Sequence, residues 1–300
     1  MTQTHPTITE LIQEHCPNGV EFKHIWEVTA WDKRFNAVDN YKQKKIIKYN
    51  YLLASDLKKL EVDGGDIKLL TTNTSELYTT QELAGDRVSD GEVVTIPWGG
   101  TANVQYYKGK FLTADNRLAT SLDTNLLNNK FLYYVMLNRT QEIQSFYRGS
   151  GIQHPSMSKV LNMKIPVPPL PVQEEIVRIL DHFTELEAEL EAELEARKKQ
   201  YEYYRDELLT FGDDVEWKTL LEACDYVDYR GKTPTKTNRG IFLVTTKNIR
   251  QGYIDYESSQ EYISKDDYNV VMRRGVPEIG DVLITTEAPC GFVAQVDKKE

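Results

Sequence analysis

The sequence predicts an α+β fold in which two mixed α/β domains are joined by one long, coiled-coil-forming helix and the second domain is incomplete. Three observations support this. Residues 173–210 contain neither proline nor glycine. The opening of the first domain recurs 195 residues later. Hydrophobic residues make up 40% of the 300-residue chain, which is enough to form a core on each side of the helix. We expect the first domain at 1–165, a proline connector and the long helix at 166–212, and the N-terminal part of the second domain at 213–300.

The long helix follows from residue type and spacing. Residues 173–210 are mostly Glu, Ala, Leu, Arg, Lys and Gln, the strongest helix formers, and would span roughly 57 Å at about 1.5 Å per residue. Apolar residues recur at nearly 3.5-residue spacing, which predicts a coiled-coil interface. These residues are Ile176, Leu180, Phe183, Leu186, Leu190, Leu194, Tyr201, Tyr204 and Leu208. The preceding Pro166, Pro168, Pro169 and Pro171 predict an extended, unpaired segment.

A tetrapeptide repeat lies inside this helix. Glu-Ala-Glu-Leu occurs at 187–190 and again at 191–194. Four residues add about 6 Å of helix, roughly two base-pair steps if DNA lies alongside. The alternative is an acidic, solvated face on a coiled-coil linker, and the repeat alone leaves both interpretations open.

Cysteine usage and hydropathy predict a soluble cytoplasmic protein. Cys16, Cys224 and Cys290 are odd in number, far apart and without ligand-spaced partners, as expected for reduced thiols and not for a metal site. No window approaches the roughly 18 apolar residues that a membrane span needs, and the N-terminus lacks a signal-peptide pattern.

The net charge of −10 is distributed unevenly. It amounts to +1 over residues 1–165, −7 over 166–212 and −4 over 213–300, so the helix carries most of the acid. Residues 31–50 reach +4 with aromatic residues between the cations. Cations suit phosphates, and aromatic and amide side chains suit bases, so this segment predicts a DNA-facing loop. A solvated lysine-rich loop is the alternative.

Local patterns place the elements of the first domain. We expect a short helix at 9–15, a strand at 20–28 that runs into a helical turn, and strands at 67–72 and 91–96. Helical apolar spacing extends over 125–147 and ends at the glycine-containing residues 148–151. Because the strands are not separated by regular crossovers, the domain is mixed α+β.

An internal repeat indicates a duplicated domain. Residues 215–222 match residues 20–27, with Val, Glu, Lys and the final Glu identical. Residues 241–246 are similar to residues 67–72, and residues 280–285 are similar to residues 91–96. Segments 91–96 and 280–285 are each followed by a turn that contains Pro and Gly. A period of about 195 residues is a domain and not a solenoid unit.

Several motifs in this order resemble one family. They are Gly-Ser-Gly-Ile-Gln-His at 149–154, the run from Lys164 through Gln173-Glu174-Glu175-Ile176, the Glu-rich leucine helix, and the segments 229–234 and 243–249. The chain resembles the specificity subunit of type I restriction–modification systems. The resemblance implies two target recognition domains that each read half of a bipartite site in double-stranded DNA, at a distance held by conserved helices. It also implies modification and restriction subunits as partners, which carry S-adenosylmethionine, ATP and Mg, with no cofactor in this chain.

The sequence departs from the family plan in one respect. A complete member carries a second conserved helix that packs antiparallel on the first, and this sequence reaches Glu300 without one. We expect the full protein to be longer. The alternative is a truncated subunit that self-associates through the stripe from Ile176 to Leu208 and reads a symmetric site.

No motif predicts catalysis by this chain. The triplet at 231–233 imitates a phosphate loop, but Tyr226 stands in place of its first glycine and Pro234 follows. Pro168-Pro169 lacks the Asn or Asp of an amino-methyltransferase motif, because Val167 precedes it. No nucleophile triad or spaced carboxylate cluster is present, so we expect a non-catalytic subunit. A coiled-coil scaffold that does not bind DNA remains the rival class.

We predict that DNA faces five segments, residues 31–48, 98–103 and 148–154 of the first domain and residues 229–236 and 246–250 of the second. Lysines would neutralise phosphates, while Arg34, Asn103, Gln153, Arg230 and Asn248 suit base edges, since Arg pairs two acceptors of guanine and Asn or Gln pairs adenine. In the first domain the candidates are Trp31, Lys33, Arg34, Lys42, Lys44, Lys45, Lys48, Trp98, Asn103, Arg148, Gln153 and His154. In the second they are Tyr229, Arg230, Lys232, Thr233, Lys236, Lys247, Asn248 and Arg250.

Overall fold

The computed structural model describes residues 6–229, 231, 233–287 and 289–298. It divides into two compact units, Met1–Tyr203 (unit 1) and Tyr204–Glu300 (unit 2). Arg230 and Lys232, two of the candidate DNA contacts, lie outside the described residues. None of the helices in the described part of the chain combines the length and apolar character that a bilayer crossing requires.

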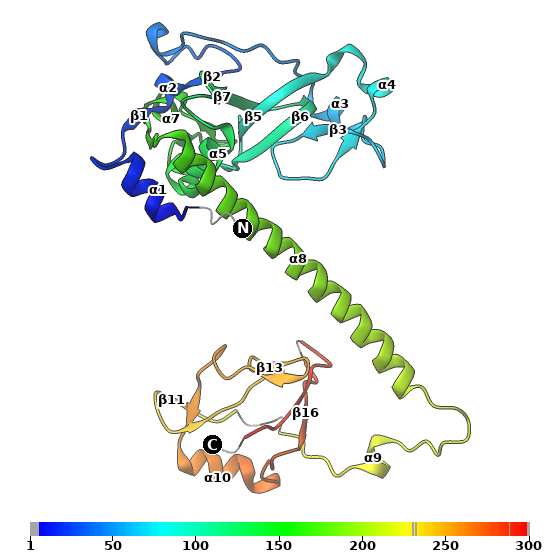
Figure 1. Ribbon diagram of the computed structural model, residues 1–300. Helices are drawn as coiled ribbons and strands as arrows, with labels where there is room; N and C mark the ends of the chain where they lie inside the picture. The colour runs from blue at the N-terminus through cyan, green and yellow to red at the C-terminus, as the bar shows by residue number, and fades with distance from the viewer. Residues whose placement is uncertain (1–5, 230, 232, 288, 299–300) are drawn as a thin grey trace. The chain divides into compact units, whose positions relative to one another are not determined.

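Unit 1 is built on a six-stranded sheet with the order β2-β7-β5-β6-β3-β4 (Figure 1). Neighbouring strands are antiparallel except β3 and β6, which are parallel. The strands are β2 (Thr29–Trp31), β3 (Ile67–Leu70), β4 (Tyr78–Thr79), β5 (Ser89–Pro97), β6 (Gln105–Thr113) and β7 (Asn116–Ser121). The strands predicted at 67–72 and 91–96 are thereby confirmed as β3 and β5.

Short helices surround the sheet and pack on it in several buried clusters. The larger core joins Val94 and Ile96 of β5 to the helices α2, α5, α6 and α7 and the start of α8, and a smaller one packs α3 and α4 on β3. The helices are α1 (Ile8–His15), α2 (Ile25–Val28), η1 (Asn40–Lys42), α3 (Ala54–Lys58), α4 (Gln81–Ala84), η2 (Gly85–Arg87), α5 (Asn129–Asn138), α6 (Thr140–Ser145) and α7 (Met157–Asn162). The short helix predicted at 9–15 is confirmed as α1.

The single helix predicted over 125–147 is wrong in one respect, since the structure has two. Arg139 separates α5 from α6 and adopts φ −109° and ψ 21°. At this point the Thr140 hydroxyl donates a hydrogen bond to the Leu137 carbonyl, and Arg139 reaches the Lys164 carbonyl. Local side-chain bonds to the backbone of this kind compete with a continuous helix.

The proline run was predicted to be extended and unpaired, and this is wrong at both ends, since the run is paired in a strand at its start and helical at its end. Pro166 belongs to β10 (Lys164–Pro166), which pairs with β1 (Phe22–His24), and the Val167 amide donates to Glu21 O at 2.8 Å. The segment is therefore paired at its start. The long helix α8 (Leu170–Leu209) begins three residues before Gln173, because Pro171 in a first turn needs no amide partner.

The core of unit 1 anchors the start of helix α8. Val172 and Gln173 are buried, and Ile176 and Val177 pack against the main core. From Phe183 onward the side chains are exposed, and the helix extends away from the sheet (Figure 1). The uninterrupted helix predicted for this segment is confirmed.

Unit 2 contains small sheets and a small hydrophobic core around Ile249, Ile254 and Ala294. One sheet has the order β11-β15-β12, and β13 pairs with β14 and β16 with β17. The elements are α9 (Leu220–Ala223), β11 (Lys236–Thr237), β12 (Ile241–Phe242), β13 (Ile249–Arg250), β14 (Tyr253–Ile254), β15 (Tyr262–Ile263), α10 (Lys265–Val271), η3 (Met272–Arg274), β16 (Val282–Ile284) and β17 (Val293–Gln295).

The internal repeat extends to hydrogen bonds. In unit 1 the His24 amide donates to Glu27 Oε2 at 2.5 Å, and at the matching place in unit 2 the Thr219 amide donates to Glu222 Oε2 at 2.8 Å. In both units the strand before the Pro and Gly turn pairs with the strand after it, β5 with β6 and β16 with β17. The two units therefore share local structure at these two places.

Candidate nucleic-acid interface

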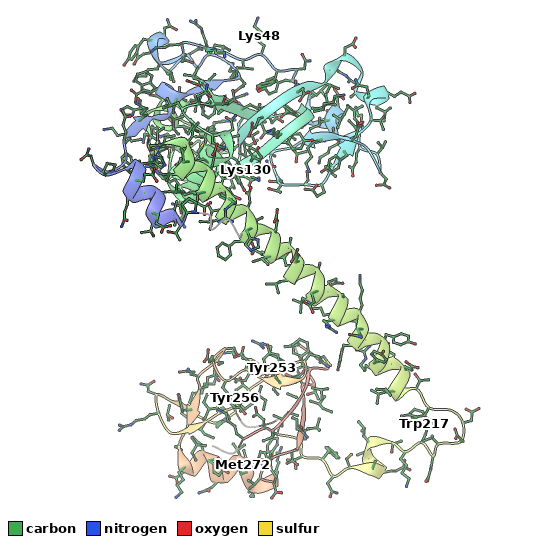
Figure 2. All side chains as sticks on the ribbon, in the orientation of Figure 1. Lys48, Lys130, Trp217, Tyr253, Tyr256 and Met272 are labelled. Carbon is green, nitrogen blue, oxygen red and sulfur yellow. The ribbon has the colours of Figure 1, made fainter. Side chains whose placement is uncertain are left out.

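The basic loop, residues 33–48, is held firmly although it contains little regular structure. Gln43 is buried, accepts a hydrogen bond from the Phe35 amide and donates to the carbonyls of Phe35 and Val38. The Ile47 amide donates a hydrogen bond to Trp31 O, on the edge strand of the sheet. The loop therefore presents its lysines from a fixed backbone, and Lys48 projects from its outer side (Figure 2).

Trp31 does not lie at the surface where we predicted it. It is 4% exposed, packs edge-on against Phe35 and donates its indole hydrogen bond to Thr29 Oγ1. An aromatic residue next to cations can face the core as easily as a ligand, and strand β2 directs this one inward. Trp31 supports the basic loop from beneath.

Three segments that the sequence keeps apart converge on Trp98. His154 Nδ1 lies 2.6 Å from Trp98 O, and its ring centroid lies 5.2 Å from that of Trp98. Lys33 Nζ lies 4.9 Å from the Trp98 ring centroid. Partial burial and then the neighbouring Arg117 charge lower the pKa of Lys33, while Asp32 opposes them. Lys33 therefore holds its positive charge over the Trp98 ring, where it would attract an approaching anion.

A buried ion pair that we did not predict supports this surface. Arg117 of β7 lies with its Cζ 4.3 Å from the Trp98 ring centroid, and its Nη1 donates to Asp32 Oδ2 at 3.1 Å. Asp32 also accepts from the Leu118 amide and from the Tyr51 hydroxyl, and burial together with the Asp32 charge raises the pKa of Tyr51. No short-range sequence signal marks Asp32 and Arg117 as partners, because 85 residues separate them.

The glycine loop, residues 148–154, is shaped by two close approaches. A Cβ at Gly99 would lie 2.9 Å from Ile152 Cγ2, and the Gly100 amide donates to Gln153 O at 2.9 Å. Gly149 has φ +141°, and a Cβ there would lie 2.8 Å from Ile152 O. The loop leaves Arg148 and Gln153 exposed beside the Trp98 turn.

Replacing Gly149 with alanine is expected to destabilise unit 1 by about 1–3 kcal/mol, because a side chain would require both a strained backbone angle and movement of Ile152. Gly151→Ala is the matched control, since nothing lies within 4 Å of its added Cβ. Urea unfolding of the two variants measures the difference. Equal stability of both would show that the loop does not hold this conformation.

The remaining unit 1 candidates differ in availability. Lys42 forms an ion pair with Asp39 and donates a hydrogen bond to Asn162. Arg34 donates a hydrogen bond to Asn40. The side-chain amide of Asn103 donates to Thr72 O. Lys44, Lys45 and Lys48 are exposed, and none of the ion pairs in the described part of the chain involves them. These three lysines are therefore available to phosphates.

In unit 2 the structure changes the interpretation of one candidate. Asn248 is 0% exposed, and its side chain accepts from Thr245 and donates to the carbonyls of Asp255 and Ser259. It therefore organises a loop and has no free group for a base. Because Asn248 lies between Lys247 and Arg250 in a polar segment, its sequence context did not indicate burial.

The other unit 2 candidates lie at or near the surface, mostly with partners. Lys236 and Lys247 both bind Glu261, at 2.8 and 3.0 Å, and these two lysines lower the pKa of Glu261. Arg250 lies 3.7 Å from Asp255, and the Tyr229 hydroxyl donates to Gly275 O. Thr233 is exposed. A phosphate would have to compete with Glu261 for both lysines.

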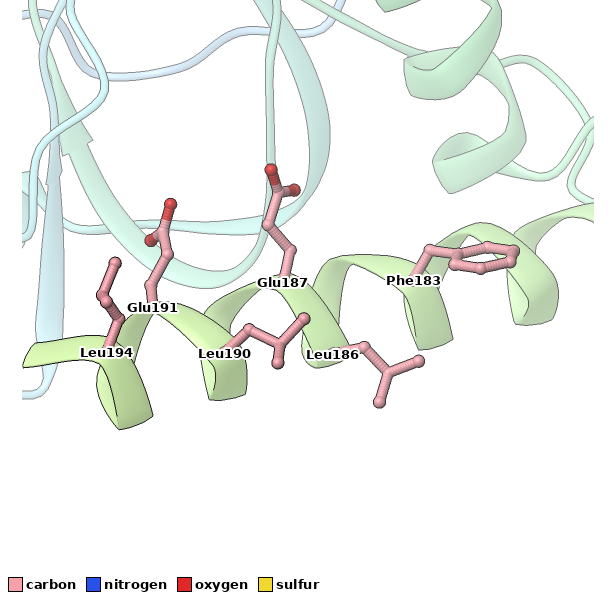
Figure 3. A pocket seen from close by; sticks show the side chains of 6 residues that line it. All are labelled: Phe183, Leu186, Glu187, Leu190, Glu191 and Leu194. Carbon is pink, nitrogen blue, oxygen red and sulfur yellow. The ribbon is translucent and has the colours of Figure 1, made fainter. Parts of the chain in front are cut away.

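The predicted helix interface is exposed only in part. Ile176 packs into the core of unit 1, because it lies on the anchored part of α8, and Leu180 is half-buried. Farther along, Phe183, Leu190 and Leu194 are 64%, 66% and 56% exposed. Leu186 and Leu190 project from one side of the helix and Glu187 and Glu191 from another (Figure 3). Tyr201, Tyr204 and Leu208 are also exposed.

Within the described ranges, no group of three or more His, Cys, Asp or Glu side chains is arranged to hold a metal ion. The three cysteines are free, with Cys16 buried and the other two exposed.

The described structure combines a mixed α/β unit, cations beside Trp98 and a long exposed helix. The family model of the type I restriction modification DNA specificity domain matches residues 38–196, more than half of the chain. The chain belongs to this family, as its motifs predicted.

Relatives agree with this assignment. The chain is 38% identical over 164 residues to the type I restriction enzyme EcoR124I/EcoR124II specificity subunit of Escherichia coli, and 36% identical over 182 residues to the EcoprrI specificity subunit of the same organism. These matches cover 50% and 56% of this chain but 39% and 41% of the relatives. The chain thus spans less than half the length of either relative.

Among solved structures, the S subunit of a type I restriction–modification system from M. genitalium has a TM-score of 0.48 and 16% sequence identity, over 83% of this chain and 63% of that one.

Proposed function

We propose that this chain is a DNA sequence-recognition subunit that reads a bipartite target and positions other subunits on it. The observation that carries the proposal is the convergence of Lys33, Trp98 and His154 on one surface of unit 1, with Lys44 and Lys45 available on the adjoining loop. Cations and aromatic groups on a fixed backbone suit phosphates and bases. Family membership supports the same conclusion.

The chain is proposed to be non-catalytic. Methyl transfer and cleavage would be performed by modification and restriction subunits, which would also carry S-adenosylmethionine, ATP and Mg. Unit 2 would read the second half of the target, and α8 would determine the spacing. The absence of a recognisable nucleophile or cofactor motif in the sequence supports this division of labour.

Lys44→Ala tests the phosphate contacts. We expect binding to weaken alike on all sequences, and the slope of log affinity against log salt to fall by about 0.9, the value for one phosphate contact. Lys58→Ala is the control, since Lys58 is an exposed lysine of α3 outside the basic loop. Fluorescence anisotropy with labelled duplexes at several salt concentrations gives both slopes. An unchanged slope for Lys44→Ala would exclude it from the interface.

A second candidate arrangement has structural support. The exposed apolar side chains of Phe183, Leu190 and Leu194 form a stripe on α8 of the kind that helix pairs bury. Two chains that associate through this stripe would present two copies of unit 1 and read a symmetric site. The symmetry of the recognised motif distinguishes this arrangement from the first.

A further inference from the structure

Besides the apolar packing of Val172, Ile176 and Val177, two polar contacts hold the start of α8 against unit 1. The first is Gln173, which is 0% exposed, accepts from the Asn128 amide and donates to the carbonyls of Leu126 and Pro168. The second is Asp181, two turns later, which accepts from Tyr134 at 2.6 Å and from Lys130 at 2.7 Å. Both of these donors belong to α5, and Figure 2 labels Lys130 beside the first turns of α8.

The Asp181 contact is built differently from a surface ion pair. The side chains of Lys130 and Asp181 are 33% and 27% exposed. Burial, and then the hydrogen bond to Asp181, raise the pKa of Tyr134 to about 12. Lys130 also lies 5.5 Å from the ring centroid of Tyr106, whose hydroxyl donates to Glu92 of β5. The contact therefore links α8 to the strand that ends beside Trp98.

We propose that Asp181 is a positioning residue that sets the direction of α8 and, through it, the spacing between the two DNA half-sites. The spacing part rests on the proposed function. Asp181 lies about 12 Å along the helix from Gln173, whereas Leu209 lies about 54 Å from Gln173. A displacement of about 1 Å at Asp181 would therefore move Leu209 by about 4.5 Å, more than the roughly 3.4 Å between base pairs.

The first test measures the helix without DNA. Spin labels are placed at Lys110 on β6 and Lys198 on α8, both exposed and both in unit 1, in a chain whose three cysteines are replaced. We expect one narrow distance distribution for the wild type and for Asp206→Ala, which removes an exposed carboxylate from the same helix. Asp181→Ala should broaden the distribution. An unchanged width for Asp181→Ala overturns the proposal.

A second pair of variants covers the case in which Asp181→Ala fails to fold. Tyr134→Phe and Lys130→Met each remove one of the two hydrogen bonds and keep most of the packing. Their combination should broaden the same distribution. If the folded double variant keeps the wild-type width, Asp181 does not hold the helix.

The second test concerns spacing. DNA methylation in cells that express this chain with a modification subunit shows which spacer the wild type accepts. With Asp181→Ala, both half-sites should stay the same, and the preference for that spacer over one longer or shorter by a base pair should fall about tenfold, the equivalent of one charge-assisted hydrogen bond. An unchanged preference overturns the role in spacing. If the wild type yields no motif, the proposed function fails, whereas the spin-label distances still decide whether Asp181 directs the helix.

Discussion

Replacing Asp32 with alanine is expected to lower the free energy of unfolding of unit 1 by about 3–5 kcal/mol, the usual cost of removing one partner from a buried ion pair. The Asp32 side chain is fully buried and Arg117 is 9% exposed, so Arg117 would keep its charge without a counterion. The Leu118 amide and the Tyr51 hydroxyl would lose their acceptor as well. Urea unfolding followed by tryptophan fluorescence measures the loss.

The matched control is Asp39→Ala. Asp39 is 63% exposed and pairs with Lys42, so its removal should cost less than about 1 kcal/mol. Replacing both Asp32 and Arg117 by apolar residues should cost less than Asp32→Ala alone, because no unpaired charge remains. A loss below about 1 kcal/mol for Asp32→Ala would show that Arg117 finds another partner or is hydrated, contrary to its burial.

Deleting residues 191–194 is expected to shorten the spacer between the half-sites by one or two base pairs. Four residues contribute about 6 Å of helix, or nearly two base-pair steps of about 3.4 Å. The deletion also turns the remainder of α8 by about 400°, only about 40° beyond a full turn, so the apolar stripe keeps nearly the same side. The change therefore affects length more than the face that α8 presents.

The motif methylated by the deletion variant measures the spacer. Glu191→Gln combined with Glu193→Gln is the control, because it removes the same two charges and keeps the length of the helix. That variant should retain the original spacer. If the deletion also retained it, α8 would not determine the spacing, and the acidic-linker interpretation of the repeat would be preferred.

The sequence predicted the long helix, strands β3 and β5 and the internal repeat, because each depends on periodic or matching residues close together in the chain. The errors arose where strand pairing or side-chain bonds to the backbone override the proline and apolar patterns. Pro166 pairs in a strand although the proline run indicated an unpaired segment, and Thr140 and Arg139 interrupt a helix whose apolar spacing continues.

For the candidate site, residue type and spacing select segments of the chain, and the structure shows which of their side chains are exposed. The basic loop, the Trp98 turn and the glycine loop do meet, but only the structure shows that Lys33 and His154 share the Trp98 ring. Trp31 and Asn248 have the residue types of DNA contacts and are buried. Residue type alone does not reveal which side of a strand or loop faces the core, and Asp32 and Arg117 are partners only because β2 and β7 are adjacent.

The most direct test of the central claim is the methylome of cells that express this chain together with a type I modification subunit. We expect a new bipartite methylated motif with two different halves, one read by each unit. A palindromic motif would instead indicate two copies of unit 1 held together by the stripe on α8. No new motif, together with no binding of duplex DNA by the purified chain at low salt, would contradict DNA recognition and favour a scaffold role.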